Sequence, residues 1–433
     1  MAPRVYKGTF GPAQAERLLW RAGFGPRRGE AKALAAKGLD AGVLTLTRPG
    51  SEQLVGPEPK ADKGLPIAPA DAFGHDHIWW LDRMVRSSNS LVERMTLVWH
   101  DWFATQRVGG AAQRLMLDQN ELFRRHALGS FSALLVDVTK DPAMLLWLNG
   151  NRNTKRSPNE NYARELMELF TLGADRGYTE ADVREQARAL TGWRNTYVRG
   201  TGPHDFRYDP TRHDGGTKSV FGKTGAFGWE DACRLCLENP QHPSFFVDKL
   251  WSYFVPVAPD RVTRSALEGI YRERYEIRPV VEAILRHPVL YTGPRMVKPP
   301  VVYAAGLLRT AEAGVAGDTW TRLGVASGQR LFAPPNVAGW DERRWLDTST
   351  FRGRWLIAGT ALAAAPRRPL GGTRSPQLLL EHAVNFLGKP ELSAETRRVL
   401  LRFGTDALRS QPPPVVEGAL RQLVAASPEF QTS

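Results

Sequence analysis

A set of helix start and stop signals begins at Ser157 and limits the folds that the chain can adopt. Ser157 precedes Pro158 and stands three residues before Glu160, a pattern typical of an N-cap, a proline in the first helical turn and a capping box. Gly173 follows an apolar run and fits a helix stop. The segment therefore predicts a helix over about residues 158–172.

Similar signals predict helices elsewhere in the chain. Thr179 and Asp182 have the spacing of a cap for a second helix, which would form a tight hairpin with the first. Ser90 and Glu93 predict a capping box for a helix over residues 91–104, which is apolar on most of its circumference. Strand alternation is scarce, so we predict an all-α, multi-helical protein.

Three stretches rich in turn-forming residues interrupt the helical pattern. We predict long irregular loops near residues 48–72, 194–228 and 328–354, the second with room for a small β-hairpin. Residues 1–365 are interpreted as one large helical domain, and residues 376–433 as a C-terminal helical subdomain packed on it. A chain of 433 residues, 42% hydrophobic and 24% charged, is long enough for such a core.

The chain is basic, with a formal net charge of +13 and a calculated isoelectric point of about 9.9. Only 12 of its 58 basic residues are lysine, and the cations are scattered among acids instead of forming runs. This pattern favours a compositional arginine bias over a nucleic-acid partner. No stretch has the length and apolar character of a signal peptide or a transmembrane segment, so the sequence predicts a cytoplasmic protein.

Several catalytic signatures are missing from the sequence. It contains no P-loop, no nucleotide-binding glycine fingerprint, no H-E-x-x-H and no G-x-S-x-G, which disfavours nucleotide-driven and serine-esterase chemistry. Cys233 and Cys236 form a C-R-L-C pair, but no second pair completes a zinc site. We expect two reduced thiols on a helix.

One face of the predicted 158–172 helix carries its strongly polar groups. At 100° per residue, the same arc holds Glu160, Asn161, Arg164, Glu165 and Glu168. As a solvated surface, this arc would contribute ion pairs of roughly a few tenths of a kcal/mol each. As a site, its carboxylates and Arg164 would be catalytic, and Asn161 would bind the substrate.

His100 and Asp101 lie in the apolar 91–104 helix, where a polar side chain needs a partner. In a structural role, His100 would bond to a backbone carbonyl or to one glutamate, and Asp101 would pair with arginine. In a functional role, His100 would face Glu165 and Glu168 as ligands of a divalent transition metal, with Asp101 as a further catalytic group.

A glycine-rich loop offers His213 and Asp214 as further candidates. His213 could close over the acidic helix and complete either the metal shell or a general acid/base pair. Alternatively, this pair caps its own loop through backbone hydrogen bonds. Lys218 and Lys298 are candidate binding groups for an anionic substrate, although an isolated lysine is most often a solvated charge.

The segment P-P-N-V-A-G-W, residues 334–340, predicts a rigid turn that presents Asn336 and Trp340. Both are candidate substrate-binding residues, and the indole could stack on a sugar ring. Core packing is the alternative role for the tryptophan.

Long segments along the chain resemble one bacterial protein family. They are NENYARELMELFTLG and GYTEADVREQARALTGW, together with LLWRAGFGP, ERMTLVWHDWFAT, DPAMLLWLNGNRN, HDGGTKSVFG, DKLWSYFV, MVKPPVVYAAGLLR, GQRLFAPPNVAGW and SPEFQ. The chain is identified on these segments as a member of the domain-of-unknown-function 1800 family. The resemblance spans nearly the whole chain and implies a shared fold without naming a reaction. Because members are often exported and commonly encoded beside a sulfatase-like family, it also implies a protein partner from that family.

The leading hypothesis from the sequence is a metal- or carboxylate-assisted hydrolase with its site between the 91–104 and 158–172 helices. Its substrate would be a small molecule or glycan-like. One alternative is a non-catalytic binding or assembly scaffold whose polar cluster is structural, and a further alternative is a metal-dependent oxidoreductase. An enzyme requires an open cavity that reaches His100 and the acidic face, whereas a scaffold predicts that these groups satisfy one another.

Overall fold

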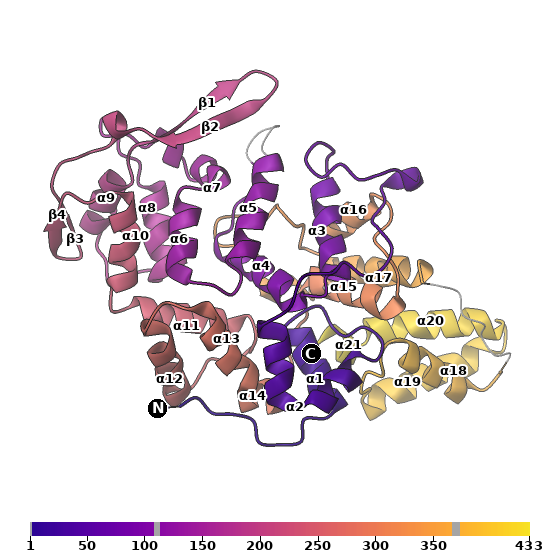
Figure 1. Cartoon of the computed structure of the whole chain (residues 1–433). Coiled ribbons are helices and arrows are strands. Elements are labelled where there is room, and N and C mark those ends of the chain that lie inside the picture. Colours follow the sequence, from indigo (N-terminus) through magenta and orange to yellow (C-terminus); the bar gives the residue numbers. More distant parts are fainter. Residues whose placement is uncertain (1, 108–112, 366–372) are drawn as a thin grey trace.

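A computed structural model describes residues 2–107, 113–365 and 373–433. Helices make up most of the described chain, and two small antiparallel sheets complete it (Figure 1). The prediction of an all-α fold with a small hairpin is therefore confirmed. The predicted linker between the two proposed domains falls largely on residues 366–372, which lie outside the described residues.

The helices follow one another along the whole chain. In the first half they are α1 (Pro12–Arg21), α2 (Glu30–Thr47), α3 (His75–Arg86), α4 (Ser90–Trp102), α5 (Gln113–Arg125), α6 (Phe131–Thr139), α7 (Pro142–Trp147), α8 (Asn161–Glu165), α9 (Glu180–Ala189) and α10 (Trp229–Glu238). In the second half they are α11 (His242–Ser252), α12 (Arg261–Arg272), α13 (Ile277–Arg286), α14 (Pro288–Thr292), α15 (Pro300–Ala311), α16 (Thr319–Ala326), α17 (Thr348–Ala363), α18 (Pro376–Phe386), α19 (Ala394–Ala407), α20 (Pro413–Ala426) and α21 (Pro428–Gln431). Short 3-10 turns span Asp62–Gly64, Gly150–Arg152, Pro210–Arg212 and Glu342–Arg344, and a π-helix spans Leu166–Thr171.

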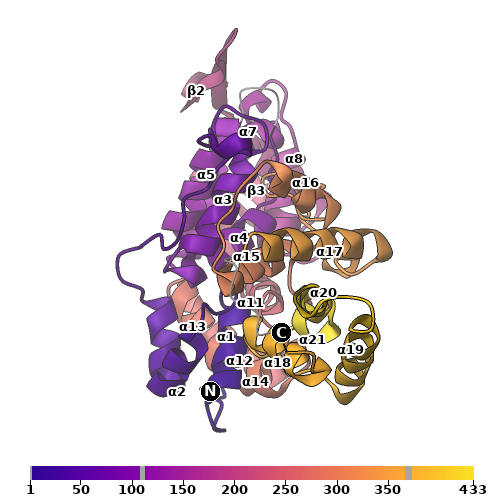
Figure 2. The ribbon, with the colours of Figure 1, turned by 90° about the vertical axis from the view of Figure 1, so that its right-hand side faces the viewer.

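The predicted hairpin in the 194–228 region is present. Strands β1 (Trp193–Val198) and β2 (Gly202–Tyr208) pair antiparallel, with Trp193 opposite Tyr208 and Val198 opposite Gly202. This hairpin projects from the helical body in two perpendicular views (Figures 1 and 2). A second, shorter hairpin joins β3 (Lys218–Val220) to β4 (Lys223–Gly225) and packs on α9.

The predicted 328–354 loop is shorter than expected, because α17 begins inside it at Thr348. Its start follows from a local signal, since the Asp347 carboxylate accepts a hydrogen bond from the Thr350 backbone N–H at 2.8 Å. That contact is an N-cap, which supplies an acceptor for a donor in the first helical turn. The same Asp-x-x-Thr pattern was available in the sequence and was missed.

The hydrophobic core has two parts. One part is an aromatic cluster around α4 in which Trp99, Trp102, Phe103 and Phe131 are fully buried. It extends through α6, the π-helix, α10, α11 and α13. Since aromatic side chains each bury a large area, this cluster is a major source of stability for the middle of the chain.

The second part of the core joins segments distant in sequence. It contains residues of α3, α15 and α17 together with residues of α18 and α20, including the buried Ile357, Leu379 and Leu420. The C-terminal helices therefore share a core with the middle of the chain. The division into domains at residues 365 and 376 stays a prediction.

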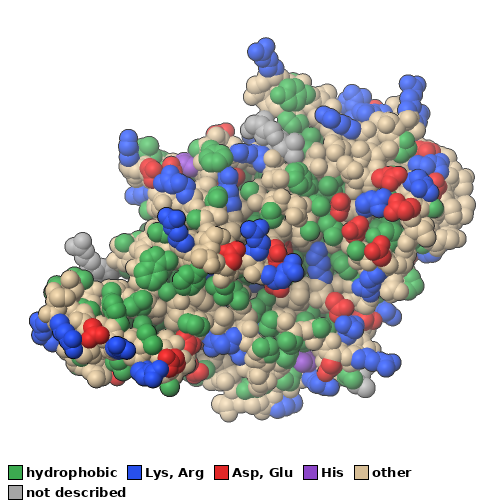
Figure 3. All heavy atoms as spheres, turned by 180° about the vertical axis from the view of Figure 1, so that it is seen from behind, with side chains coloured by type: hydrophobic (Ala, Val, Ile, Leu, Met, Phe, Trp, Pro, Cys, Tyr) green, Lys and Arg blue, Asp and Glu red, His purple; other side chains and the backbone are tan. Residues whose placement is uncertain are grey.

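The surface carries both signs of charge. On the face shown in Figure 3, lysine and arginine side chains are dispersed among aspartate and glutamate, and hydrophobic side chains gather toward the side of α17 and the C-terminal helices. No helix in the described part of the chain combines the length and the apolar character needed to cross a membrane.

Candidate functional site

The acidic helix starts later than its sequence punctuation predicts. Ser157 pairs with Thr154 in an isolated β-bridge instead of capping a helix, so the predicted Ser157 cap is wrong. The Asn159 side chain takes that role, because its Oδ1 accepts from the Asn161 N–H at 3.0 Å. α8 then runs on into the π-helix, and the predicted stop is confirmed at Gly173, which has a φ of 98°.

The π-helix exposes backbone carbonyls that other elements bind. Its wide turn is closed by the Leu172 N–H, which donates to the Met167 carbonyl five residues earlier at 2.8 Å. Side chains occupy the three successive carbonyls of residues 169–171: Lys249 Nζ at 2.8 Å, Trp102 Nε1 at 3.0 Å and His242 Nδ1 at 2.8 Å. The irregular turn is thus held by donors from α4 and α11, and such turns often occur at functional sites.

Part of the outward face of α8 forms surface ion pairs. Arg164 contacts Glu180 through two hydrogen bonds of 2.8 Å each, and it contacts Glu160 at 3.2 Å. Bonding to Glu180 raises the pKa of Arg164, which therefore stays charged. Glu160 and Arg164 follow the structural interpretation of the acidic face, because they satisfy each other at the surface.

Three other side chains of the same face behave differently. Asn161 is exposed, Glu165 and Glu168 are half-buried, and none of these side chains forms a hydrogen bond or an ion pair within residues 2–107, 113–365 and 373–433. Burial, and next the charge of Glu168, raises the pKa of Glu165. Two neighbouring carboxylates without protein donors, one of them with a raised pKa, are an arrangement that acid–base chemistry uses.

His100 lies away from that acidic face, in an aromatic enclosure. Its Nε2 accepts from the Phe332 N–H at 3.2 Å, and its ring lies 5.3 Å from that of Trp80 and 5.4 Å from that of Trp340. Burial lowers the pKa of His100 to about 3, so the ring is neutral and carries its proton on Nδ1. His100 is therefore a core histidine, as the structural interpretation predicts, but its partner is a backbone N–H and not the predicted carbonyl or glutamate.

The predicted metal site is not assembled. His100 is enclosed by residues of the 328–340 segment, and Glu165 and Glu168 have no histidine beside them. Within the part of the chain that is described, no three His, Cys, Asp or Glu side chains are grouped closely enough to hold a metal ion. The set of His100, Glu165, Glu168 and His213 was therefore wrong as a shared ligand shell, and the oxidoreductase alternative loses the same ligands.

Burial of His100 predicts a pH effect on stability. Below the unfolded-state pKa of about 6.5, the unfolded chain gains a proton that the folded protein does not accept until about pH 3, so stability is lost as pH falls. We expect His100 alone to cost about 2 kcal/mol between pH 7 and pH 5. Urea unfolding of the wild type and of His100→Gln at pH 7 and pH 5 measures this cost, and the glutamine keeps an acceptor for the Phe332 N–H. The unfolding free energy of the variant relative to the wild type should rise by about 2 kcal/mol from pH 7 to pH 5. A pH-independent difference would contradict a neutral His100.

Asp101 anchors the 334–340 loop. Its Oδ1 accepts from the Trp340 N–H at 2.8 Å, and its Oδ2 accepts from the Tyr253 hydroxyl at 2.7 Å. Burial raises the pKa of Asp101, and burial also lowers the pKa of Lys249 to about 8, with Asp101 opposing that shift. Asp101 is thus fully occupied by its partners, and its contacts do not match the predicted pairing with arginine.

The sequence prediction missed Lys249, which donates to the Leu169 carbonyl of the π-helix, and Tyr253, which donates to Asp101. They are spaced four residues apart at the C-terminal end of α11, so both reach the same side. The lysine ammonium lies 4.6 Å from the Trp102 ring centre. A lysine among the apolar residues of DKLWSYFV was the available signal.

The loop residue Asn336 contacts its own turn, and Trp340 contacts His100. The Asn336 Oδ1 accepts from the Ala338 N–H at 2.9 Å, which closes a local turn while the side chain stays exposed. The Trp340 ring is half-buried against His100. No contact within the described residues places either side chain beside Glu165 or Glu168.

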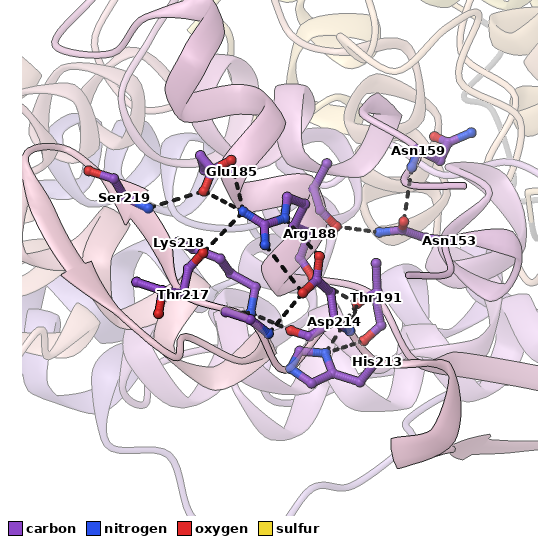
Figure 4. A network of polar contacts seen from close by, with 12 residues as sticks. Asn153, Asn159, Glu185, Arg188, Thr191, His213, Asp214, Thr217, Lys218 and Ser219 are labelled. Carbon is purple, nitrogen blue, oxygen red and sulfur yellow. Dashed lines mark hydrogen bonds and ion pairs between the residues drawn. The ribbon is translucent and has the colours of Figure 1, made fainter. Parts of the chain in front are cut away.

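The glycine-rich loop is organised by Arg188 of α9 (Figure 4). Arg188 Nε contacts Asp214 at 2.7 Å, and its Nη1 contacts Glu185 at 2.8 Å. Glu185 in turn accepts from the Ser219 N–H at 3.1 Å. This network attaches the loop and β3 to α9.

The side chains of His213 and Lys218 are both bonded to backbone carbonyl groups. His213 Nδ1 lies 3.0 Å from the Thr191 carbonyl, and burial lowers the pKa of this histidine. Lys218 is buried and donates to the carbonyls of Gly216, at 3.0 Å, and Asp214. Of the predicted pair, Asp214 caps its own loop, because its Oδ1 accepts from the Gly216 N–H at 2.9 Å, whereas His213 bonds to Thr191 outside the loop.

Lys298 is enclosed in the second core. Its Nζ donates to the Phe430 carbonyl at 2.6 Å and lies 3.6 Å from the centre of the Trp20 ring. Only 3% of the residue is exposed. The lysine holds the C-terminal segment in place, so the predicted contact with an anionic substrate was wrong for Lys298.

Comparison with known proteins gives one match. A family model described as protein of unknown function (DUF1800) covers residues 17–432. No curated protein and no solved structure matches the chain.

Proposed function

The chain belongs to the DUF1800 family of proteins of unknown function, and we propose that it is a hydrolase that works through the carboxylates of Glu165 and Glu168. One observation carries the proposal. Of the candidate site residues, these two glutamates and Asn161 are the ones whose side chains the described structure leaves without partners, on a half-buried face beside a π-helix. The substrate class is a small molecule or a glycan-like compound.

The two carboxylates suit complementary roles. Burial, and next the charge of Glu168, raises the pKa of Glu165, which favours this carboxyl group as the acid that gives a proton to a leaving-group oxygen. Glu168 then takes a proton from the attacking water, so that one bond to the leaving oxygen breaks as one bond to water forms. Asn161 presents an amide that can orient the substrate through donor and acceptor contacts.

Carboxylate chemistry alone is sufficient for this proposal. The imidazoles expected to complete a divalent-metal shell are bonded to the Phe332 N–H and the Thr191 carbonyl instead. Any cation at Glu165 and Glu168 would need its remaining ligands from water or substrate.

Substitution of Glu165 by glutamine tests the proposal. We expect hydrolysis of a panel of aryl glycosides and esters to fall at least about a hundredfold. The unfolding free energy should be unchanged or higher by up to about 0.5 kcal/mol, because glutamine replaces a half-buried carboxyl group that forms no hydrogen bond or ion pair within the described residues. Steady-state kinetics and urea unfolding measure the two effects.

Glu160→Gln is the matched control. It removes a carboxylate from the same helix, but one that is bound to Arg164 at the surface. Retained activity in this variant is expected. Loss of stability in Glu165→Gln, or equal activity in Glu165→Gln and wild type, would refute the catalytic role.

A binding or assembly scaffold is the second candidate, because α17 has an exposed apolar side. Phe351, Trp355 and Leu356 are exposed there, and Val325 of α16 is exposed on the neighbouring helix. Exposed apolar groups gathered in one region commonly mark protein contacts. If the chain is a scaffold for a co-encoded sulfatase-like protein, that protein should co-elute with the Glu165→Gln variant but not with the Trp355→Ser variant.

A further inference from the structure

A cavity of about 170 Å³ lies between α1, α2 and the start of α4. These helices lie together in Figure 1, with α1 and α2 at the bottom and α4 above them. α2 is bent at Gly38, whose φ of 78° interrupts the helix, and Lys37 and Thr45 on either side of the bend both line the cavity. None of the hydrolase residues is part of this wall.

The N-terminus of α4 supplies unused hydrogen-bond donors at the cavity. The Asn89 side chain does not cap this helix, because its Nδ2 donates to the Gly50 carbonyl. Across the described residues, the backbone N–H groups of residues 90–92 have no acceptor. Of these three residues Ser90 lines the cavity, so a free backbone donor lies in its wall at the positive end of the dipole of this 13-residue helix.

Ser90 is an independent sign of a missing ligand. It lines the cavity and is only 4% exposed. Its hydroxyl group forms no hydrogen bond with any residue that the structure describes. The hydroxyl oxygen is not among the fully buried side-chain atoms that lack a partner, so it keeps some exposed surface and an acceptor that enters the cavity can bond to it.

The charge balance of the cavity favours an anion. Lys37 Nζ donates to the Thr45 hydroxyl at 3.2 Å and has no carboxylate partner within the described segments. Glu30 is the one acidic side chain in the cavity wall, and its Oε2 is held by the Arg27 N–H at 2.6 Å and by Arg309 at 3.2 Å. The uncompensated charge is therefore the lysine ammonium.

We propose that this cavity binds a small organic anion, with a phosphate-like oxyanion at the start of α4 and Lys37 and a compact apolar body against the remaining wall. That wall contains Leu19, Leu34, Leu46 and Pro49. A cavity of about 150 Å³ accepts benzene, so an aromatic ring of that size fits here. Helix N-termini bind phosphate, sulfate and carboxylate through the same donors, and a phosphate group has enough oxygens to meet the Ser90 N–H, the Ser90 hydroxyl and Lys37 together.

Phenyl phosphate is the probe that tests this site, by isothermal titration at low ionic strength. We expect saturable binding to the full-length protein, weakened at least about fivefold in Lys37→Met. Ser90→Ala should also weaken binding while leaving the melting temperature unchanged, because its hydroxyl has no partner to lose. Lys32→Met is the matched control, an exposed lysine of the same helix outside the cavity wall, and should bind like wild type.

Three results would overturn the proposal. One is no binding up to about 10 mM phenyl phosphate, and another is equal weakening in Lys32→Met and Lys37→Met, which indicates general attraction to a basic protein. The third is equally tight binding of inorganic phosphate, which excludes a role for the apolar wall. Binding retained in Glu165→Gln is expected, so failure here and failure of the hydrolase proposal are distinguishable.

Discussion

Replacement of Glu93 by glutamine is expected to lower the unfolding free energy by about 3 kcal/mol. Glu93 is fully buried and accepts from Arg124 at 2.6 Å, from Arg83 at 3.1 Å and from Trp80 Nε1 at 3.0 Å. Burial alone would raise the pKa of Glu93, but the two guanidinium groups outweigh it and hold the pKa below its usual value. The carboxylate is therefore charged in the folded protein.

The magnitude follows from what the glutamine leaves behind. Breaking a buried ion pair from one side costs about 3–5 kcal/mol, because the remaining charge stays in a poorly solvated place. Arg83 keeps Glu52 at 2.6 Å and Arg124 keeps Glu121 at 2.6 Å, so we expect the lower end of that range. Chemical unfolding at pH 7 measures the loss.

Glu238→Gln serves as the control for Glu93→Gln. It removes one carboxylate that also contacts two cations, Lys223 and Arg234, but at the surface. Little change in stability is expected there, since exposed ion pairs contribute little. A similar stability in both variants would show that burial does not strengthen the Glu93 contacts.

Replacement of Gly339 by alanine is expected to cost about 3 kcal/mol and to detach the 334–340 loop from Asp101. Gly339 has a φ of 89°, a region that costs other residues roughly 1–3 kcal/mol. An added Cβ would lie 2.3 Å from Asp101 Oδ1 and 2.9 Å from its backbone oxygen, which adds about 1–3 kcal/mol of overpacking. The backbone contact leaves little room for relief by side-chain motion.

A second glycine separates the two contributions. Gly222 has a φ of 74°, and a Cβ there would meet no atom within 4 Å, so Gly222→Ala reports backbone strain alone. We expect Gly339→Ala to lose more stability than this control. The Trp340 indole should also change its fluorescence as its amide leaves Asp101, and equal losses without a spectral change would argue against a tight loop contact.

Local caps were predictable where both partners are close in sequence. Thr179 and Asp182 form the predicted reciprocal cap, with the Asp182 carboxylate accepting from the Thr179 N–H at 2.8 Å. The predicted cap of Ser90 and Glu93 is wrong, because Glu93 turns inward to Arg83 and Arg124. Two buried guanidinium groups attract a carboxylate more strongly than one backbone N–H does.

The reduced thiols on a helix were likewise predicted correctly. Cys233 and Cys236 are free and buried on α10. Burial raises the pKa of each thiol to about 12, so both are protonated near neutral pH. The absence of a second cysteine pair in the sequence argued against a four-cysteine site, and this required no knowledge of their neighbours.

The candidate site was predictable only in part. Helical spacing predicts one polar face for Asn161, Glu165 and Glu168, and all three side chains are exposed or half-buried, but Glu168 lies in the π-helix, where the rotation per residue differs from the α-helical value. It could not show that Arg164 pairs with Glu180, or that His100 turns toward Phe332. Those partners come from segments whose approach is set by packing.

The helical class and the hairpin that begins at Trp193 could be predicted from the sequence, since each depends on residues a few positions apart. Only the tertiary structure decided which polar groups are left without partners. His100, Asp101, His213 and Lys298 are satisfied by distant segments, whereas Glu165 and Glu168 are not. The physical reason is that a buried polar group takes the nearest donor or acceptor in space, and nearness in space is decided by how the helices pack.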